Sequence, residues 1–105
     1  MSSLEQDFHR EMVAMYEAQK AYGYNAAYFK QMLDEQGGVE AARRLLAAPK
    51  PQEGLYTLWD LDRLGDSVEA YVLRIEYEAP FNEAERAEAR RRLDELGYFK
   101  VPRGE

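Results

Sequence analysis

Apolar residues in the first half of the chain recur at spacings of three and four, which is the period of an amphipathic α-helix. This period predicts three helices, over residues 4–21, 25–36 and 39–48. The clearest apolar stripe, in the first of them, consists of Phe8, Met12, Met15 and Tyr16. Gly37 and Gly38 separate the second helix from the third, because glycine tolerates the left-handed turn that follows a helix.

The same period predicts three further helices after the loop at residues 49–54, whose two prolines block helix continuation. They cover residues 55–63, 66–76 and 82–96. Several helix starts carry residue pairs with the spacing of a capping box, which supports these boundaries. The pairs are Ser2 with Glu5 or Ser3 with Gln6, Asp66 with Glu69, and Asn82 with Glu85.

Residues 70–77 fit two patterns. A helix would bury Val68, Tyr71, Val72 and Ile75 on one face. A strand over Ala70–Tyr77 is the alternative, because tyrosine, valine and isoleucine favour strands and apolar residues alternate there. The cap and the three-four spacing favour the helix. The whole pattern therefore predicts an all-α fold, a single small domain of five or six short helices over residues 1–105, with a flexible tail at 100–105.

The only tryptophan, Trp59, lies in a dense apolar run within residues 54–77. On a helix, Leu55, Leu58 and Trp59 share a face. We expect the segments on either side to fold over this stretch. The indole would then be interior scaffolding, and the carboxylates beside it would face outward.

Composition narrows the possible functions. The chain has 105 residues, no cysteine and a formal net charge of −6. Without cysteine, disulfides, thiolate catalysis and cysteine-based metal sites are excluded. The negative charge disfavours direct binding to nucleic acids and to anionic membranes. The N-terminus lacks the pattern of a signal peptide and no apolar run is long enough to span a membrane, so we expect a cytoplasmic protein.

A pattern of particular residues is spread along the chain, within roughly residues 8–98. It comprises Gly23-Tyr24, Phe29, Met32, Gly37-Gly38, Ala41-Ala42, Leu45-Leu46, Gly54-Leu55, Leu58-Trp59, Arg63-Leu64, Ser67-Val68-Glu69, Phe81 and Glu85. This pattern resembles a family of small uncharacterised bacterial proteins, found alone or attached to larger chains. The resemblance implies one bacterial domain that spans the chain. It implies no catalytic residue, because no activity is established for that family.

Acidic residues concentrate in the middle of the chain, where residues 60–78 hold six acids against Arg63 and Arg74. The cluster is either a solvated helical face or a docking surface for a basic partner, since complementary charge favours association. Arg63 is expected to pair with Glu69 or Asp66. The predicted protein-binding residues are Asp60, Asp62, Asp66, Glu69, Tyr71, Glu76 and Tyr77.

The sequence signals for other functional sites are weak. Asp60 and Asp62 resemble the start of a calcium-binding loop, but its twelfth position is Tyr71, where a bidentate glutamate is required. No metal or cofactor site is therefore predicted. His9, the only histidine, has no identifiable catalytic partner and is expected at the surface. The run Arg90–Arg92 lies among acids, which predicts a salt-bridged surface helix in preference to a phosphate site.

Eight tyrosines against four phenylalanines indicate core-edge packing or an interface, with Tyr16, Tyr22, Tyr24 and Tyr28 grouped around the first helix–helix joint. No catalytic residue is predicted. Our leading hypothesis is a non-catalytic acidic interaction or accessory module of a bacterial cytoplasmic complex; a homo-oligomer is also compatible with the sequence. A second hypothesis is an acidic inhibitor or nucleic-acid mimic, antitoxin-like or anti-defence-like. A third is an enzyme that uses Asp62, Asp66 and Glu69 around Arg63.

Overall fold

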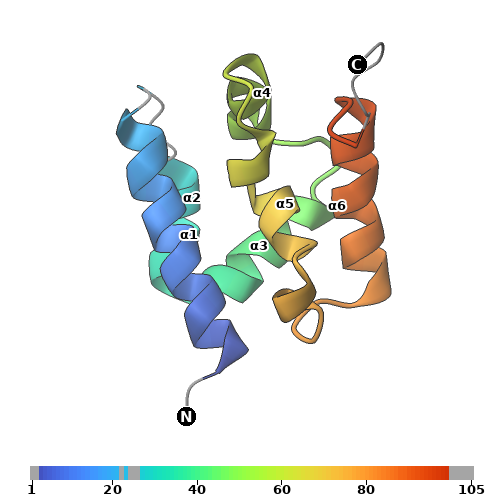
Figure 1. Ribbon diagram of the computed structural model, residues 1–105. Helices are drawn as coiled ribbons and strands as arrows, with labels where there is room; N and C mark the ends of the chain where they lie inside the picture. The colour runs from blue at the N-terminus through green and yellow to red at the C-terminus, as the bar shows by residue number, and fades with distance from the viewer. Residues whose placement is uncertain (1–2, 22, 24–26, 100–105) are drawn as a thin grey trace.

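Helices build all the regular structure in the described part of the computed structural model, residues 3–21, 23 and 27–99 (Figure 1). The elements are α1 (Leu4–Ala21), α2 (Ala27–Gln36), α3 (Gly38–Ala47), α4 (Glu53–Asp60), the 3₁₀ turn η1 (Leu64–Asp66), α5 (Val68–Val72), the 3₁₀ turn η2 (Ile75–Tyr77) and α6 (Glu83–Glu95). These six helices, with no strand among the described residues, confirm the all-α prediction.

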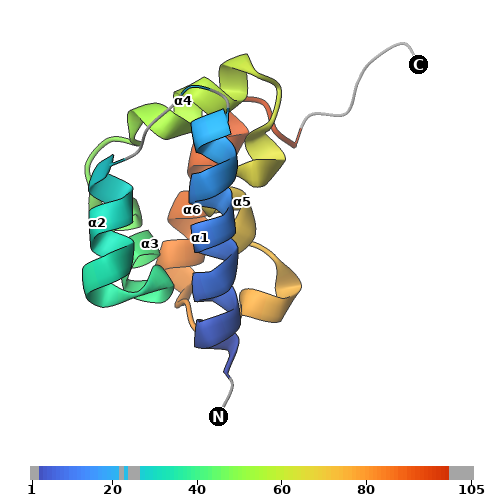
Figure 2. The same ribbon diagram turned by 90° about the vertical axis from the view of Figure 1, so that its left-hand side faces the viewer.

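Helix α3 lies at the centre, in contact with α1, α2, α5 and α6. The outer helices α1 and α6 flank it, and α4 lies across the end of the molecule at which α6 also terminates (Figures 1 and 2). The radius of gyration is 13.5 Å. That value is close to the roughly 13 Å expected of one domain of this length.

Two separate clusters of buried apolar side chains hold the helices together. The main core joins α1, α2, α3, α5, η2 and α6 through Phe8, Met12, Met15, Tyr16, Phe29, Met32, Leu33, Ala41, Ala42, Leu45, Leu46, Val68, Val72, Tyr77, Phe81 and Ala89. The smaller one, which we call the α4 cluster, contains Leu55, Leu64 and Leu93. Most of the apolar stripe predicted for each long helix is thus buried, whereas only a few leucines join α4 to η1 and α6.

Tyr77 belongs to the main core, which corrects its predicted place on a binding surface. Its ring meets Phe8 edge-to-face at 5.0 Å between centroids, and Phe8 meets Phe81 in the same way at 5.1 Å. The Tyr77 hydroxyl donates a hydrogen bond to the Glu11 carboxylate. Burial and this carboxylate raise the pKa of the Tyr77 phenol. The tyrosine is interior because its one polar atom is satisfied at the edge of the core.

The α2–α3 joint depends on two glycines with different roles. Gly37 has φ 87°, a conformation that side chains disfavour, so it can end α2 as predicted. A Cβ on Gly38 would lie 2.7 Å from the His9 Cα. The first turn of α3 therefore packs directly against the backbone of α1, because a residue without a side chain stands there.

Helix caps follow the prediction at two places and depart from it at a third. The Asn82–Glu85 capping box is present, and the Ser3 Oγ accepts from the Gln6 amide; Ser2 lies outside the described residues. At α5 the cap is Ser67 and not Asp66. The Ser67 Oγ accepts from the Ala70 amide at 3.1 Å and donates to the Leu64 carbonyl at 2.7 Å. A buried hydroxyl therefore joins η1 to α5.

The helix predicted over residues 66–76 is interrupted, and the strand alternative for Ala70–Tyr77 is wrong. Helix α5 ends at Val72. There the Arg86 guanidinium of α6 donates hydrogen bonds to the Val72 and Leu73 carbonyls at 2.7 and 3.3 Å. A charged donor thus replaces the amides that would continue the helix. Ile75, predicted to be buried, is consequently 83% exposed on η2.

Candidate protein interface

Trp59 lies on the surface, with 48% of its area exposed, which contradicts its predicted interior position. Leu55, one turn earlier on the same face of α4, packs against Leu93 of α6 in the α4 cluster. The apolar stripe then continues toward the end of α4, at the end of the molecule where α6 also stops (Figures 1 and 2). Leu55 and Leu58 of this stripe are covered by other elements, whereas the indole near the end of α4 keeps much of its surface in water.

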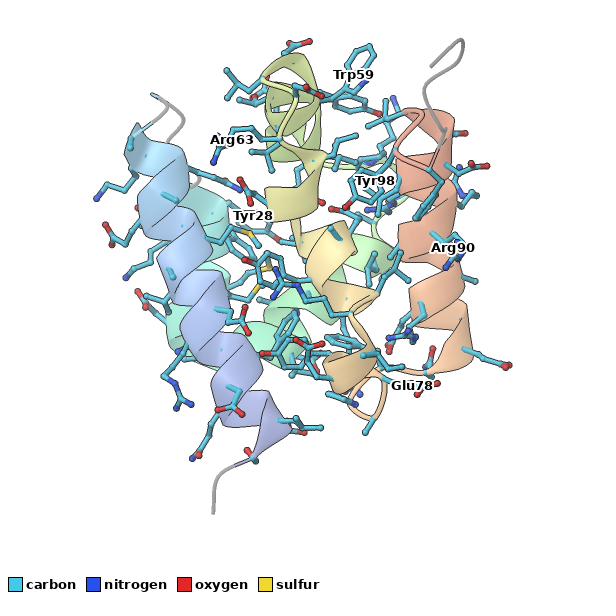
Figure 3. All side chains as sticks on the ribbon, in the orientation of Figure 1. Tyr28, Trp59, Arg63, Glu78, Arg90 and Tyr98 are labelled. Carbon is cyan, nitrogen blue, oxygen red and sulfur yellow. The ribbon has the colours of Figure 1, made fainter. Side chains whose placement is uncertain are left out.

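Exposed apolar and acidic residues surround the indole. We define the Trp59 surface as Tyr56, Trp59, Asp60, Leu61 and Asp62, all of which are exposed. Tyr98 and Phe99 lie exposed beyond the end of α6, and the Tyr98 hydroxyl stands close to Gly65 of η1. Figure 3 places Trp59 at the free end of α4 with Tyr98 on the side toward α6, and Arg63 on the opposite side, toward α1.

The end of α4 is closed by a Schellman motif, which also explains why the helix is shorter than predicted. The Asp62 amide donates to the Trp59 carbonyl at 3.0 Å, and the Arg63 amide donates to the Leu58 carbonyl at 2.7 Å. Asp62 occupies the left-handed position of this motif with φ 61°. Glycine is usual at that position, because a side chain there destabilises the backbone.

The seven predicted binding residues do not share one surface. Asp60, Asp62 and Glu76 are exposed, but Glu76 lies on η2, away from α4. Asp66 is paired with Arg63 at 3.1 Å, one of the two partners expected for that arginine. Tyr71 is half-buried beneath the Arg74 guanidinium, 3.8 Å from its ring centroid. Glu69 and Tyr77 are buried, so their prediction as residues of a binding surface is wrong.

Glu69 is buried because it faces Arg92, whose side chain is fully buried. Arg92 donates to Glu69 at 3.3 Å and to Glu88 at 2.7 Å. It also donates to the carbonyls of Leu45, Leu46 and Ala48 at the end of α3. The prediction that Arg90–Arg92 forms a surface run is therefore wrong for Arg92, which is a structural link between α3, α5 and α6.

The two carboxylates around Arg92 have opposite pKa shifts. Burial raises the pKa of Glu69, although the Arg92 guanidinium partly offsets this effect. The Arg91 guanidinium, followed by Arg92, lowers the pKa of Glu88 to about 2. The position of Arg92 was detectable in the sequence, because it lies three residues after Ala89 and four before Leu96 on the apolar face of α6.

The carboxylate arrangement required by the enzyme hypothesis is not assembled. Glu69 faces Arg92 in the interior, Asp66 pairs with Arg63 near the surface, and Asp62 is exposed beyond the end of α4. The cavity next to Glu69 and Ser67 has a volume of about 30 Å³. That volume suits one or two water molecules and no organic substrate. Within the described residues, no group of three metal-ligating side chains is present.

Several open grooves lie elsewhere, and two of them are lined by Arg63 and Asp66 or by His9. One, of about 260 Å³, runs between α1 and η1 and is lined by Ala14, Ala18, Arg63, Asp66 and Tyr71. The other, of about 700 Å³, lies where the start of α1 meets the α2–α3 joint and includes His9, Arg10 and Arg43. His9 is only partly exposed there, and its Nδ1 is buried without a hydrogen-bond partner. Neither groove combines an exposed indole with carboxylates.

No helix in the described part of the chain has both the length and the apolar character needed to cross a bilayer. No family model, curated protein or solved structure matches this sequence.

Proposed function

We propose that this protein is a non-catalytic interaction or accessory module of a bacterial cytoplasmic complex, which binds another protein through the Trp59 surface. The observation that carries the proposal is the exposure of the only tryptophan, at 48%, in a chain whose apolar stripes on α1, α2 and α3 are mostly buried. Tryptophan is enriched among the residues that dominate binding energy in protein interfaces. Exposed Leu61 and Tyr56 extend the apolar area around it.

The charges beside the indole favour a basic partner. Among the described residues, Asp60 and Asp62 form no ion pair, whereas Asp66, a few residues further on, is neutralised by Arg63. Unpaired carboxylates attract a cationic surface and repel phosphates. They also oppose a symmetric dimer through this face, because such a dimer would bring like charges together. A direct nucleic-acid ligand and a membrane surface are correspondingly disfavoured.

The other two hypotheses receive less support. A nucleic-acid mimic requires an acidic surface that is nearly continuous, but many acids here pair with arginine or lysine on the same helix, such as Asp34 with Lys30 and Glu95 with Arg91. A carboxylate enzyme requires Asp62, Asp66 and Glu69 in one cleft. Their different environments argue against that role.

Affinity purification from bacterial cells tests the proposal with matched variants. The bait is the full chain in three forms: wild type, Trp59→Ala and Tyr28→Ala. Tyr28 is the control, because it is another exposed aromatic residue, 64% accessible, on α2 and outside the Trp59 surface. Quantitative mass spectrometry compares the proteins retained by each form, and circular dichroism verifies that each variant is folded.

The expected result is at least one protein that wild type and Tyr28→Ala retain equally and that Trp59→Ala loses by about tenfold or more, as an interface hot spot predicts. Equal retention by all three folded forms would contradict the proposal. So would the retention of no specific protein by the wild type.

A further inference from the structure

Several aromatic rings and carboxylates of this protein hold a cation from the chain itself. The Lys20 and Lys30 ammonium groups lie over the Tyr16 ring at 5.4 and 5.9 Å, and the Arg90 guanidinium lies 4.7 Å from the Phe99 centroid. Arg74 covers Tyr71 in the same way. These contacts have the geometry of cation–π interactions.

The Trp59 surface holds no such cation among the described residues. No cation of the described residues lies over the indole, although tryptophan is the ring that attracts cations most strongly. Asp60 directly follows Trp59 on α4, so the two side chains point to different sides of the helix, whereas Asp62 lies just beyond the helix end. Both carboxylates lack an ion pair among the described residues. The indole and the two carboxylates are thus exposed and could contact a cation of another molecule.

We infer that the Trp59 surface binds an arginine-bearing segment of its protein partner, with the guanidinium stacked on the indole and paired with Asp60 or Asp62. The inference rests on the proposed function and adds the chemistry of the ligand. Arginine is preferred to lysine, because its planar guanidinium stacks on aromatic faces and donates two parallel hydrogen bonds to a carboxylate. Leu61 and Tyr56 provide apolar contact for the residues on either side of that arginine.

The backbone at Asp62 supports a functional reason for its carboxylate. Asp62 is the only non-glycine residue with positive φ in the described chain, and it stands where glycine would be more stable. Its side chain makes no hydrogen bond or ion pair among the described residues that would offset the cost of this backbone conformation. Binding a cation gives the carboxylate a role that the free protein does not.

A second acidic patch provides a matched control within the same molecule. On and beside η2, Glu76 and Glu78 are exposed around Ile75, which is 83% exposed. This patch has an apolar centre and two carboxylates but no indole. Figure 3 shows Glu78 and Trp59 near opposite ends of the molecule, so the two patches can be altered independently.

The test uses the full chain and defined peptides, with Trp59 fluorescence and amide NMR shifts as readouts. Because Trp59 is the only tryptophan, the fluorescence signal comes from the site itself. The probe is the acetylated, amidated peptide Gly-Ser-Leu-Arg-Leu-Arg-Ser-Gly. Matched peptides replace both arginines with lysine, with citrulline, which is uncharged but of the same shape, or with glutamate.

We expect the citrulline peptide to bind about tenfold more weakly than the arginine peptide, and the lysine peptide about threefold more weakly. The double variant Asp60→Asn with Asp62→Asn should reduce affinity for the arginine peptide about fivefold, and added salt should reduce it further. The control Glu76→Gln with Glu78→Gln should leave affinity within about twofold of the wild type.

A further variant separates stability from binding. Asp62→Gly should raise the Tm by about 4 °C, because it removes a left-handed side chain, and should weaken the arginine peptide about threefold. A purely structural Asp62 would show the first effect without the second, and that result would overturn its assigned role.

The inference fails if the arginine and citrulline peptides bind equally, or if neither shifts the Trp59 signal at about 5 mM, the range of very weak complexes. Either result would leave the proposed function standing, provided that the purified partner still depends on Trp59. Loss of that dependence would remove the proposed function itself.

Discussion

The main core and the Trp59 surface place the same kinds of residue in opposite environments. In the main core, the Phe8 ring contacts the rings of Tyr77 and Phe81. Elsewhere in the interior, the charged Arg92 is buried with every donor directed at an acceptor. At the end of α4, an indole and two carboxylates face water without such partners. Composition is therefore a poor guide to burial here, because the number of covering elements decides it.

The difference is also one of local stability. Helix α3 contacts four other helices, whereas α4 is attached mainly by Leu55 and Leu58 and by its contact with η1. Burying a leucine side chain contributes roughly 1.5–3 kcal/mol. The region with few buried side chains is also the region with exposed binding groups, as is common for surfaces that must adapt to a partner.

Arg92→Met should give the largest effect, a loss of about 3–5 kcal/mol, because it leaves Glu69 buried without its counter-charge. Methionine keeps most of the side-chain volume. Urea denaturation measures the change in the free energy of unfolding. Arg91→Met is the matched control, since Arg91 is exposed and pairs with Glu88 and Glu95 at the surface.

Adding Glu69→Gln to Arg92→Met should recover part of that loss, because the buried charge is removed. If Arg91→Met and Arg92→Met were equally mild, the Arg92 link would be no more important than a surface ion pair.

Native-state hydrogen exchange should show that α4 opens more easily than α3. We expect the opening free energy of α4 amides to lie about 2 kcal/mol or more below that of α3, because fewer buried side chains anchor α4. The comparison uses amides in the interior of each helix. Equal protection of both helices would mean that α4 unfolds only with the whole domain, and the contrast between the two regions would disappear.

Glu88→Gln should remove about 1–2 kcal/mol of stability at neutral pH, a figure reduced for solvent screening of this partly exposed group. The folded pKa of about 2 lies below the ordinary value of 4.5, so the contribution of Glu88 is complete above pH 4.5. It is lost as pH falls from there toward 2.

The free energies of unfolding of the wild type and Glu88→Gln should therefore become equal as the pH is lowered from neutral to about 2. Glu95→Gln, at the exposed end of the same cluster, is the control and should differ little at any pH. A constant gap across the whole range would show that Glu88 stabilises the fold by something other than its charge.

Trp59→Ala should have the smallest effect, about 1 kcal/mol or less, because nearly half of the indole is already in water. Phe8→Ala, at a fully buried ring, should cost about 3–5 kcal/mol. Thermal unfolding compares the two variants directly. A large loss for Trp59→Ala would restore the indole to a scaffolding role and weaken its assignment to a binding surface.

Much of the secondary structure was predictable, because its causes are local. The stripe from Phe8 to Tyr16, the break at Gly37 and the Asn82–Glu85 box all involve residues within a few positions of one another. The break after Val72 was not predictable in this way, since it depends on Arg86 from another helix. The Ser67 cap is instead a local feature, because its hydroxyl contacts Leu64 and Ala70, each three residues away.

The amino-acid sequence by itself determined the helical class, the order of the helices, the absence of cysteine chemistry and the acidic balance, because period, composition and charge belong to the chain. Only the tertiary structure decided that Arg92, Glu69 and Tyr77 are interior and that Trp59 and Ile75 are exposed. A stripe on a helix states which face is apolar, but not which of its positions another element covers. Along α4 the same apolar stripe changes from core at Leu55 and Leu58 to surface at Trp59.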